Sequence, residues 1–269
     1  MKRCEKRNIL YRHWGCSSPR AAMLMVHGLG GHSNNWEFVA RFLVEHGISC
    51  YSIELKGFGQ TEGTKGHIDS LDTYIRDVRR LYNIIKKDHR NKSVFIAGES
   101  MGGLIGFLTV IKKPGIFRGL ICISPGFKSR LKFSLMEYFR MVTARFYNQR
   151  KQFHMPFTNE MCSRDPECLK IMNNDTLEHR WATPRLLQSI LLGQLSSNLW
   201  KHKVRTDTLF LLAGADTFVN SGTSRKIFNG IKFEHKHIIE YPEMRHSLTM
   251  ELGREKVFGD LLKWVEKRI

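Results

Sequence analysis

Residues 94–103 have the sequence VFIAGESMGG, in which a serine lies between two glycines directly after an apolar run. The apolar segment 94–97 predicts a buried strand, and a helical pattern follows from about Leu104. A Gly-x-Ser-x-Gly motif also occurs in ordinary turns, because glycine and serine are both common between a strand and a helix. The motif alone therefore leaves two interpretations open for Ser100, a plain turn residue or a nucleophile.

The alternation of apolar runs and helical segments extends over most of the chain. The runs that we predict as strands are 22–26, 50–55, 94–97, 119–123, 208–213 and 237–241. The segments with helical periodicity are 36–46, 69–89, 100–113, 221–229 and 253–268. This alternation predicts an α/β fold, with a mostly parallel central sheet and helices on both faces. Such sheets bind their ligands at the carboxyl ends of the strands.

One long segment interrupts the alternation, because no strong strand signal lies between the runs that end near Ser124 and begin near Thr208. The segment is helical in character and interleaves basic with aromatic residues. Structureless loops of this length are rare, so we expect a folded subdomain. The predicted organisation is an α/β core over 1–127 and 201–269, with a helical cap over 128–200.

A serine nucleophile needs a neighbouring base and an acid that orients the base. Asp216 follows directly on the strand predicted at 208–213, and His246 follows shortly after the last one. Separately, Asp216 could cap the next helix and His246 could be an ordinary loop residue. Together they give the order Ser100, Asp216, His246, all at carboxyl ends of strands, which is typical of hydrolases with a nucleophile elbow.

A glycine-rich loop, His27-Gly28-Leu29-Gly30-Gly31, follows the first predicted strand. Acyl transfer builds negative charge on the carbonyl oxygen, and backbone N–H groups aimed at that oxygen stabilise it. We expect the N–H groups of Leu29 and Met101 to form this oxyanion hole, and we interpret His27 as a structural brace for the loop. The loop lacks the Gly-Lys-Ser/Thr ending of phosphate-binding loops.

The chain is strongly basic, with 269 residues and a formal net charge of +18. Such a charge favours nucleic acid, an anionic lipid surface or an acidic substrate as partner, and a solvated basic surface is the alternative. No nucleic-acid motif accompanies the charge, so we expect no nucleic-acid partner.

The cellular compartment is predicted from what the sequence lacks. The first residues include no apolar stretch long enough for a signal peptide, and no run approaches the roughly 20 apolar residues that span a bilayer. We therefore expect a soluble cytoplasmic protein with six reduced cysteines, a Cys162–Cys168 disulfide being the alternative. The cysteines show no metal-ligand spacing, and we expect no metal site.

These motifs resemble the α/β-hydrolase superfamily, and most closely its monoacylglycerol lipase and lysophospholipase branch, which is grouped with serine aminopeptidase-like hydrolases. Besides the serine motif and the glycine-rich loop, Gly57-Phe58-Gly59 and Asp216 with His246 carry the resemblance. Weaker similarity to the cap of that branch lies in 163–167, 175–177 and 180–183. The resemblance implies hydrolysis of a monoacylglycerol or lysophospholipid ester without a cofactor.

Two positions depart from the pattern of that branch. Glu54-Leu55-Lys56 stands where Asp-x-Arg is usual, which we expect to affect structural support. Glu99 stands where His or Leu is common. Its carboxylate could favour the imidazolium form of His246 or point into a salt bridge behind the turn, and the sequence favours the salt bridge.

The predicted cap has an apolar face with basic residues around it. Leu131, Leu135, Phe139 (or Tyr138), Val142 and Phe146 recur at helical spacing. The face could pack on the hydrolase body or rest on an anionic membrane and admit single-chain lipids. Alternatives to the lipid esterase are a carboxylesterase for small or medium-chain esters, a peptidase or acyltransferase with the same triad, and a non-catalytic binding protein on this scaffold.

Overall fold

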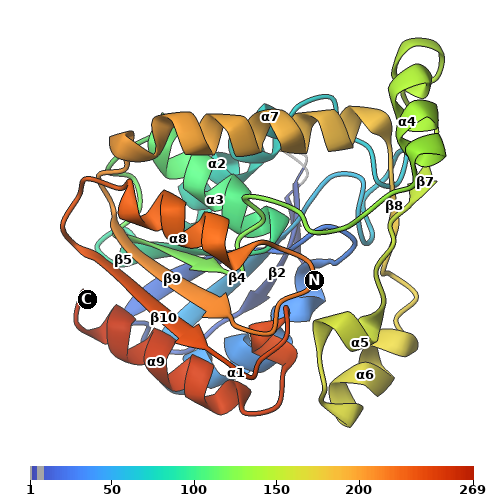
Figure 1. The fold of residues 1–269 in the computed structure, drawn as a ribbon. Helices are drawn as coiled ribbons and strands as arrows, with labels where there is room; N and C mark the ends of the chain where they lie inside the picture. The colour runs from blue at the N-terminus through green and yellow to red at the C-terminus, as the bar shows by residue number, and fades with distance from the viewer. Residues whose placement is uncertain (1, 5–8) are drawn as a thin grey trace.

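A computed structural model describes residues 2–4 and 9–269, which form an eight-stranded sheet with helices on both faces (Figure 1). The strands, in their order across the sheet, are β1 (Lys2–Cys4), β2 (Ile9–Trp14), β4 (Ile48–Glu54), β3 (Ala21–Val26), β5 (Ser93–Glu99), β6 (Gly119–Ile123), β9 (Asp207–Ala213) and β10 (Lys236–Tyr241). β2 is antiparallel to β1 and β4, and all pairings from β4 to β10 are parallel. The predicted fold class is therefore confirmed.

The central strands are mostly apolar, as strands covered on both faces need to be. In β3, Met23 and Met25 pack toward α1 (Glu37–Glu45) and α9 (Arg254–Glu266). Leu24 and Val26 point to the other face. That face is covered by α2 (Leu71–Asp88), α3 (Met101–Lys112) and α8 (Ser221–Asn229).

The register of the strands brings the predicted site residues together at the carboxyl ends of the parallel strands. Val26 pairs with Gly98, and Glu99 pairs with Ile123. Ile123 in turn pairs with Leu211. The loops after β3, β5 and β9 therefore leave the sheet at nearly the same level, which is the geometry that a parallel sheet offers to a ligand.

The strands β1 and β2 were not predicted. In β2, Ile9 and Tyr11 are buried and alternate with residues that are less buried. This is a two-residue period over a short segment with charged neighbours, so its signal is weak. The hairpin extends the sheet at the edge far from β10 and does not contribute to the site.

The segment expected to form the cap contains helices and a small two-stranded sheet. Its elements are α4 (Leu135–Tyr147), β7 (Phe153–His154), α5 (Asn159–Cys162), α6 (Pro166–Asn173), β8 (Trp181–Ala182) and α7 (Pro184–Trp200). The long α7 lies over α2 and α3, whereas α4 projects beyond the sheet (Figure 1). The short 3₁₀ helices η2 (Ser33–Trp36), η3 (Lys201–Lys203) and η4 (Leu248–Met250) lie outside this segment. The cap boundaries at 128 and 200 stay a prediction.

The apolar face predicted for the cap is exposed. α4 begins after Ser134, whose side chain accepts a hydrogen bond from the Glu137 N–H in a capping box, so Leu131 precedes the helix. Four residues of the predicted face have exposed side chains: Leu135 (89%), Phe139 (66%), Val142 (59%) and Phe146 (83%). The helix packs inward through Met141 and Ala144 instead. Of the two alternatives, packing of this face onto the hydrolase body is wrong for these four residues, whereas Leu131 does pack against the core.

The structure also decides the disulfide alternative. Cys16, Cys50, Cys122, Cys162 and Cys168 are free thiols, so the proposed pair is wrong; the side chain of Cys4 lies outside the described residues. In the ranges 2–4 and 9–269, no helix has the length and hydrophobicity needed to cross a membrane.

Candidate active site

The serine turn between β5 and α3 is sterically demanding. Ser100 has φ 55° and ψ −120°, a region that residues with a side chain rarely adopt and that costs ~1–3 kcal/mol. A Cβ on Gly98 would lie 2.2 Å from the Gly102 carbonyl oxygen, and one on Gly102 would lie 2.0 Å from that of Val26. Both positions therefore require glycine, because the turn packs against itself and against β3.

Asp216 and His246 lie together behind this turn. The Nδ1 atom of His246 is 2.8 Å from Oδ2 of Asp216, and both residues are buried. The other carboxylate oxygen of Asp216 accepts hydrogen bonds from the N–H groups of Phe218 and Val219 at 2.8 and 2.9 Å. With all these bonds made, Nδ1 of His246 carries the proton and Nε2 is left as the basic nitrogen.

The possible role of Asp216 as a helix cap is excluded. Asn220 is the N-cap of α8, and its side chain accepts the Thr223 N–H. The interpretation of His246 as an ordinary loop residue also fails, because its side chain is buried and bonded to a buried carboxylate.

The electrostatic environment of His246 has two opposing parts. Burial by itself lowers the pKa of an imidazole, because it penalises the charged form. The Asp216 carboxylate, through its charge and hydrogen bond, and then the charge of Glu99 outweigh burial and raise the pKa of His246 above its usual value. A base with this shift holds a transferred proton more firmly than an isolated histidine.

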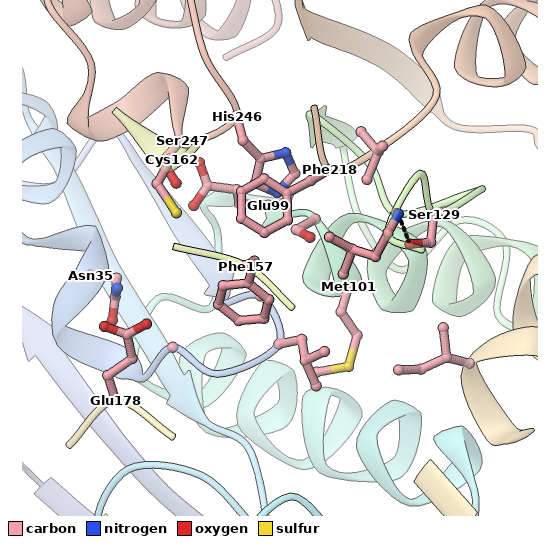
Figure 2. A pocket seen from close by; sticks show the side chains of 18 of the residues that line it. Asn35, Glu99, Met101, Ser129, Phe157, Cys162, Glu178, Phe218, His246 and Ser247 are labelled. Carbon is pink, nitrogen blue, oxygen red and sulfur yellow. Dashed lines mark hydrogen bonds between the residues drawn. The ribbon is translucent and has the colours of Figure 1, made fainter. Parts of the chain in front are cut away.

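Four of the five predicted site residues line one cavity: Ser100, His246, Leu29 and Met101. Figure 2 shows His246 and Met101 in this cavity. Asp216 lies behind His246. Among the described residues, no acceptor within the protein takes the backbone N–H of Leu29 or Met101. The Met101 N–H also lies at the N-terminus of α3, where the helix dipole favours negative charge.

The loop after β3 is held in place by His27 and Glu54. Nδ1 of His27 donates to the Gly28 carbonyl at 2.8 Å, and Nε2 accepts the Leu55 N–H at 3.1 Å. Burial is the main cause that lowers the pKa of His27 to about 4, so its ring is neutral. Glu54 accepts the Ser33 and Gln60 N–H groups. The structural roles predicted for His27 and for the segment 54–56 are therefore confirmed.

The salt bridge predicted for Glu99 is wrong. No described cation pairs with this carboxyl; its Oε1 atom is shielded from solvent and has no hydrogen-bond partner. Glu99 lies beside His246, Cys162 and Ser247 and lines the cavity (Figure 2). Burial, outweighing the opposing effect of the nearby imidazole, raises its pKa to about 7. The other interpretation considered, that Glu99 favours the imidazolium form of His246, is the one the structure supports.

Sequence reasoning missed the other residues around the cavity. The Phe218 ring lies 4.6 Å from the His246 ring, centroid to centroid. Asn35 and Glu178 lie close together at the opposite end of the cavity from Met101 (Figure 2). Phe157 and Cys162 come from the inserted segment, where no motif marks them. No group of His, Cys, Asp or Glu in the described part of the chain has the arrangement of a metal site.

Comparisons with known proteins support the α/β fold described above. The chain is 28% identical to human monoglyceride lipase over 264 residues, covering 96% of this chain and 86% of that protein. It is 24% identical to the monoacylglycerol lipase of Mycolicibacterium smegmatis, covering 96% and 92% of the two chains. The crystal structure of Paleococcus ferrophilus monoacylglycerol lipase superposes with a TM-score of 0.87 at 22% identity, covering 97% and 99%.

The predicted superfamily and branch are thereby confirmed. A family model described as serine aminopeptidase, S33, matches residues 17–253, which include the glycine-rich loop, the serine turn, Asp216 and His246. The chain belongs to this family of α/β hydrolases.

Proposed function

We propose that this chain, a serine ester hydrolase of the monoglyceride lipase type, cleaves carboxylic esters of single-chain lipids. One observation carries the proposal: Ser100 shares a cavity with His246, whose Nδ1 is held by a buried carboxylate, and with two unpaired N–H groups. The similarity to proteins named monoglyceride lipases supports a lipid ester as the substrate.

In the first half of the proposed reaction, the ester is attacked by Ser100. His246 Nε2 takes the hydroxyl proton as Oγ bonds to the carbonyl carbon, and Asp216 holds the imidazolium that forms. The Leu29 and Met101 N–H groups hold the oxyanion, each contributing typically ~3 kcal/mol. The C–O bond to the alcohol then breaks, and His246 gives its proton to the leaving oxygen.

In the second half, water replaces the alcohol. His246 takes a proton from water, whose oxygen attacks the acyl-enzyme, and the same two N–H groups hold the second oxyanion. Collapse releases the fatty acid and returns the proton to Ser100. No cofactor enters either step.

The cavity offers an apolar lining to an acyl chain. Leu131, Ile190, Val219 and Met101 are among the residues that line it, and all are apolar. A carboxylesterase for short esters would not need such a lining. The test is a chain-length series of p-nitrophenyl esters beside 1-oleoylglycerol: kcat/KM rising toward long chains supports the proposal, and a maximum at acetate or butyrate supports the short-chain alternative.

The pH dependence of kcat/KM should reflect the raised pKa of His246. The base must be neutral to act, so kcat/KM should fall as the pH drops through a pKa above the ordinary ~6.5 of histidine. Glu99→Gln removes one of the two carboxylates that raise it, so the acidic limb should move to lower pH. Glu45→Gln, at an exposed residue of α1, is the control. If the acidic limb of the pH profile were the same in Glu99→Gln as in the parent, Glu99 would not influence the pKa of His246.

We further propose that α4 docks this enzyme on an anionic membrane. The apolar residues Leu135, Phe139 and Phe146 of α4 are largely exposed, and basic residues such as Arg140 and Arg145 lie on the same helix. An apolar face with cations around it is typical of helices that lie in a membrane interface. The net charge of +18 favours the same surface.

Liposome flotation tests the docking. We expect the protein to float with vesicles that contain phosphatidylserine, and less with neutral vesicles. Phe139→Asp should weaken binding about tenfold or more, because it removes an inserted ring and adds a negative charge. Leu252→Asp, at an exposed apolar residue outside the cap, is the control and should bind as the parent does. Equal flotation with both vesicle types would refute the membrane proposal.

A further inference from the structure

The charges inside the cavity differ from those of the chain as a whole. The chain has a formal net charge of +18, yet none of the described residues that line the cavity is a lysine or arginine. Two of the lining residues are instead carboxylic acids, Glu99 and Glu178. The basic surface therefore does not extend to the place where the ester is bound.

The two carboxyl groups have different partners. Glu178 is paired with Arg180, with 2.7 Å between Oε1 and Nε, so much of its charge is compensated. Glu99 has no such partner among the described residues, and its Oε1 atom is shielded from bulk water. A charge in such a place is poorly screened by salt and acts strongly on a neighbouring ion.

Glu99 lies on the side of the cavity that receives the alcohol. His246 has to protonate the leaving oxygen, so the alcohol must lie next to its ring. Glu99 is the neighbour of that ring: the charge of each group shifts the pKa of the other. The apolar side chain of Met101 also lines the cavity and lies away from Glu99 (Figure 2).

We propose that Glu99 selects the head group by charge, so that the enzyme accepts esters of an uncharged polyol and rejects those whose alcohol carries a phosphate. The proposal rests on the proposed function and makes Glu99 a specificity-determining residue. A glycerol head carries no charge, so the Glu99 carboxylate does not repel it. A phosphate would meet no lysine or arginine among the described residues that line this cavity, and it would face the carboxylate of Glu99.

The size of the effect depends on pH. Coulomb's law gives a penalty of roughly 100-fold for two charges ~6 Å apart at an effective dielectric constant of ~20. Protonation of Glu99 limits that penalty, since its pKa is about 7. The groups that face it are His246, Asp216 and the Cys162 thiol, together with the Thr249 N–H. Discrimination should therefore be roughly 10- to 30-fold near pH 8.5 and nearly vanish at pH 6.

The experiment compares two substrates with the same acyl chain, 1-oleoylglycerol and 1-oleoyl-lysophosphatidylglycerol. The phosphodiester of the second keeps one negative charge over this pH range. Glu99→Gln should raise kcat/KM for the phosphodiester relative to the neutral ester about tenfold at pH 8.5, and about twofold or less at pH 6. Because both substrates use Ser100 and His246, the ratio cancels any effect of the variant on the catalytic groups. Glu45→Gln is the matched control.

The outcomes separate this inference from the proposed function. A ratio that is the same in the parent and in Glu99→Gln at both pH values overturns the charge selection, and so does a parent enzyme that cleaves both substrates equally. A parent enzyme that reacts with a fluorophosphonate but hydrolyses neither lipid overturns the proposed function instead. The inference is supported when the parent prefers 1-oleoylglycerol and the preference falls in the variant at the higher pH.

Discussion

Ser100→Ala should lower ester hydrolysis by at least about 10⁴-fold and leave the fold intact, because it removes only the hydroxyl that we propose as the nucleophile. Alanine keeps the Cβ that Ser100 already places at φ 55°, so the strain of the turn does not change. The Ser100 backbone bonds, with its N–H donating to Ile123 and its carbonyl accepting the Gly126 N–H, do not involve the hydroxyl. The Leu29 and Met101 N–H groups, which we propose as the oxyanion donors, stay in place, so substrate should still bind.

The measurement is kcat on 1-oleoylglycerol together with labelling by a fluorophosphonate probe and thermal unfolding. The parent should be labelled at Ser100 and the variant should not, with a melting temperature within a few degrees of the parent. Ser18→Ala, at an exposed position far from the cavity, is the matched control. Turnover retained by Ser100→Ala would mean that another residue is the nucleophile. Failure of the parent to react would favour a binding protein on a hydrolase scaffold.

The fold and the positions of Asp216 and His246 were predictable because both follow from the buried parallel sheet. A strand covered on both faces needs an unbroken apolar run, as in β3 and β9, and such runs are visible in one sequence. The carboxyl ends of parallel strands lie side by side at the same end of the sheet. Residues that directly follow these strands are therefore neighbours even when they are far apart in the chain. Asp216 and His246 could be found for this reason.

The surroundings of the site could not be predicted, because they depend on packing between distant segments. Phe157 and Cys162 enter the cavity from the insertion, whose path no motif specifies. The direction of Glu99 depends on which groups surround the turn, and the sequence offers many cations elsewhere that could have paired with it. The face of α4 shows the same limit, since periodicity identifies an apolar face but not what covers it.

The N-terminal hairpin was missed for a different reason. β2 lies near the edge of the sheet and pairs with β4 through an alternation of only a few residues. A short segment with charged neighbours carries little pattern, although all of Leu10 to Trp14 pair in register with β4.

Asp216→Asn should reduce kcat by about 10⁴-fold with little change in the free energy of unfolding. The variant therefore tests whether Asp216 orients His246 or only supports the packing around it. The asparagine can keep Oδ1 as the acceptor for Phe218 and Val219, which preserves the local turn. Its amide nitrogen then faces Nδ1 of His246 and donates to it. The imidazole proton must move to Nε2, and the ring can no longer accept the Ser100 proton.

A second readout distinguishes this effect from general damage. Asp216 is the main group that raises the pKa of His246, so the acidic limb of the residual activity should shift to lower pH in Asp216→Asn. KM should change little, because the Asp216 side chain lies behind His246 and does not line the cavity. Asp69→Asn, at a carboxylate that is 85% exposed, is the control. A variant with nearly full kcat would show that His246 is oriented by another group, and a raised KM with unchanged kcat would place Asp216 in substrate binding.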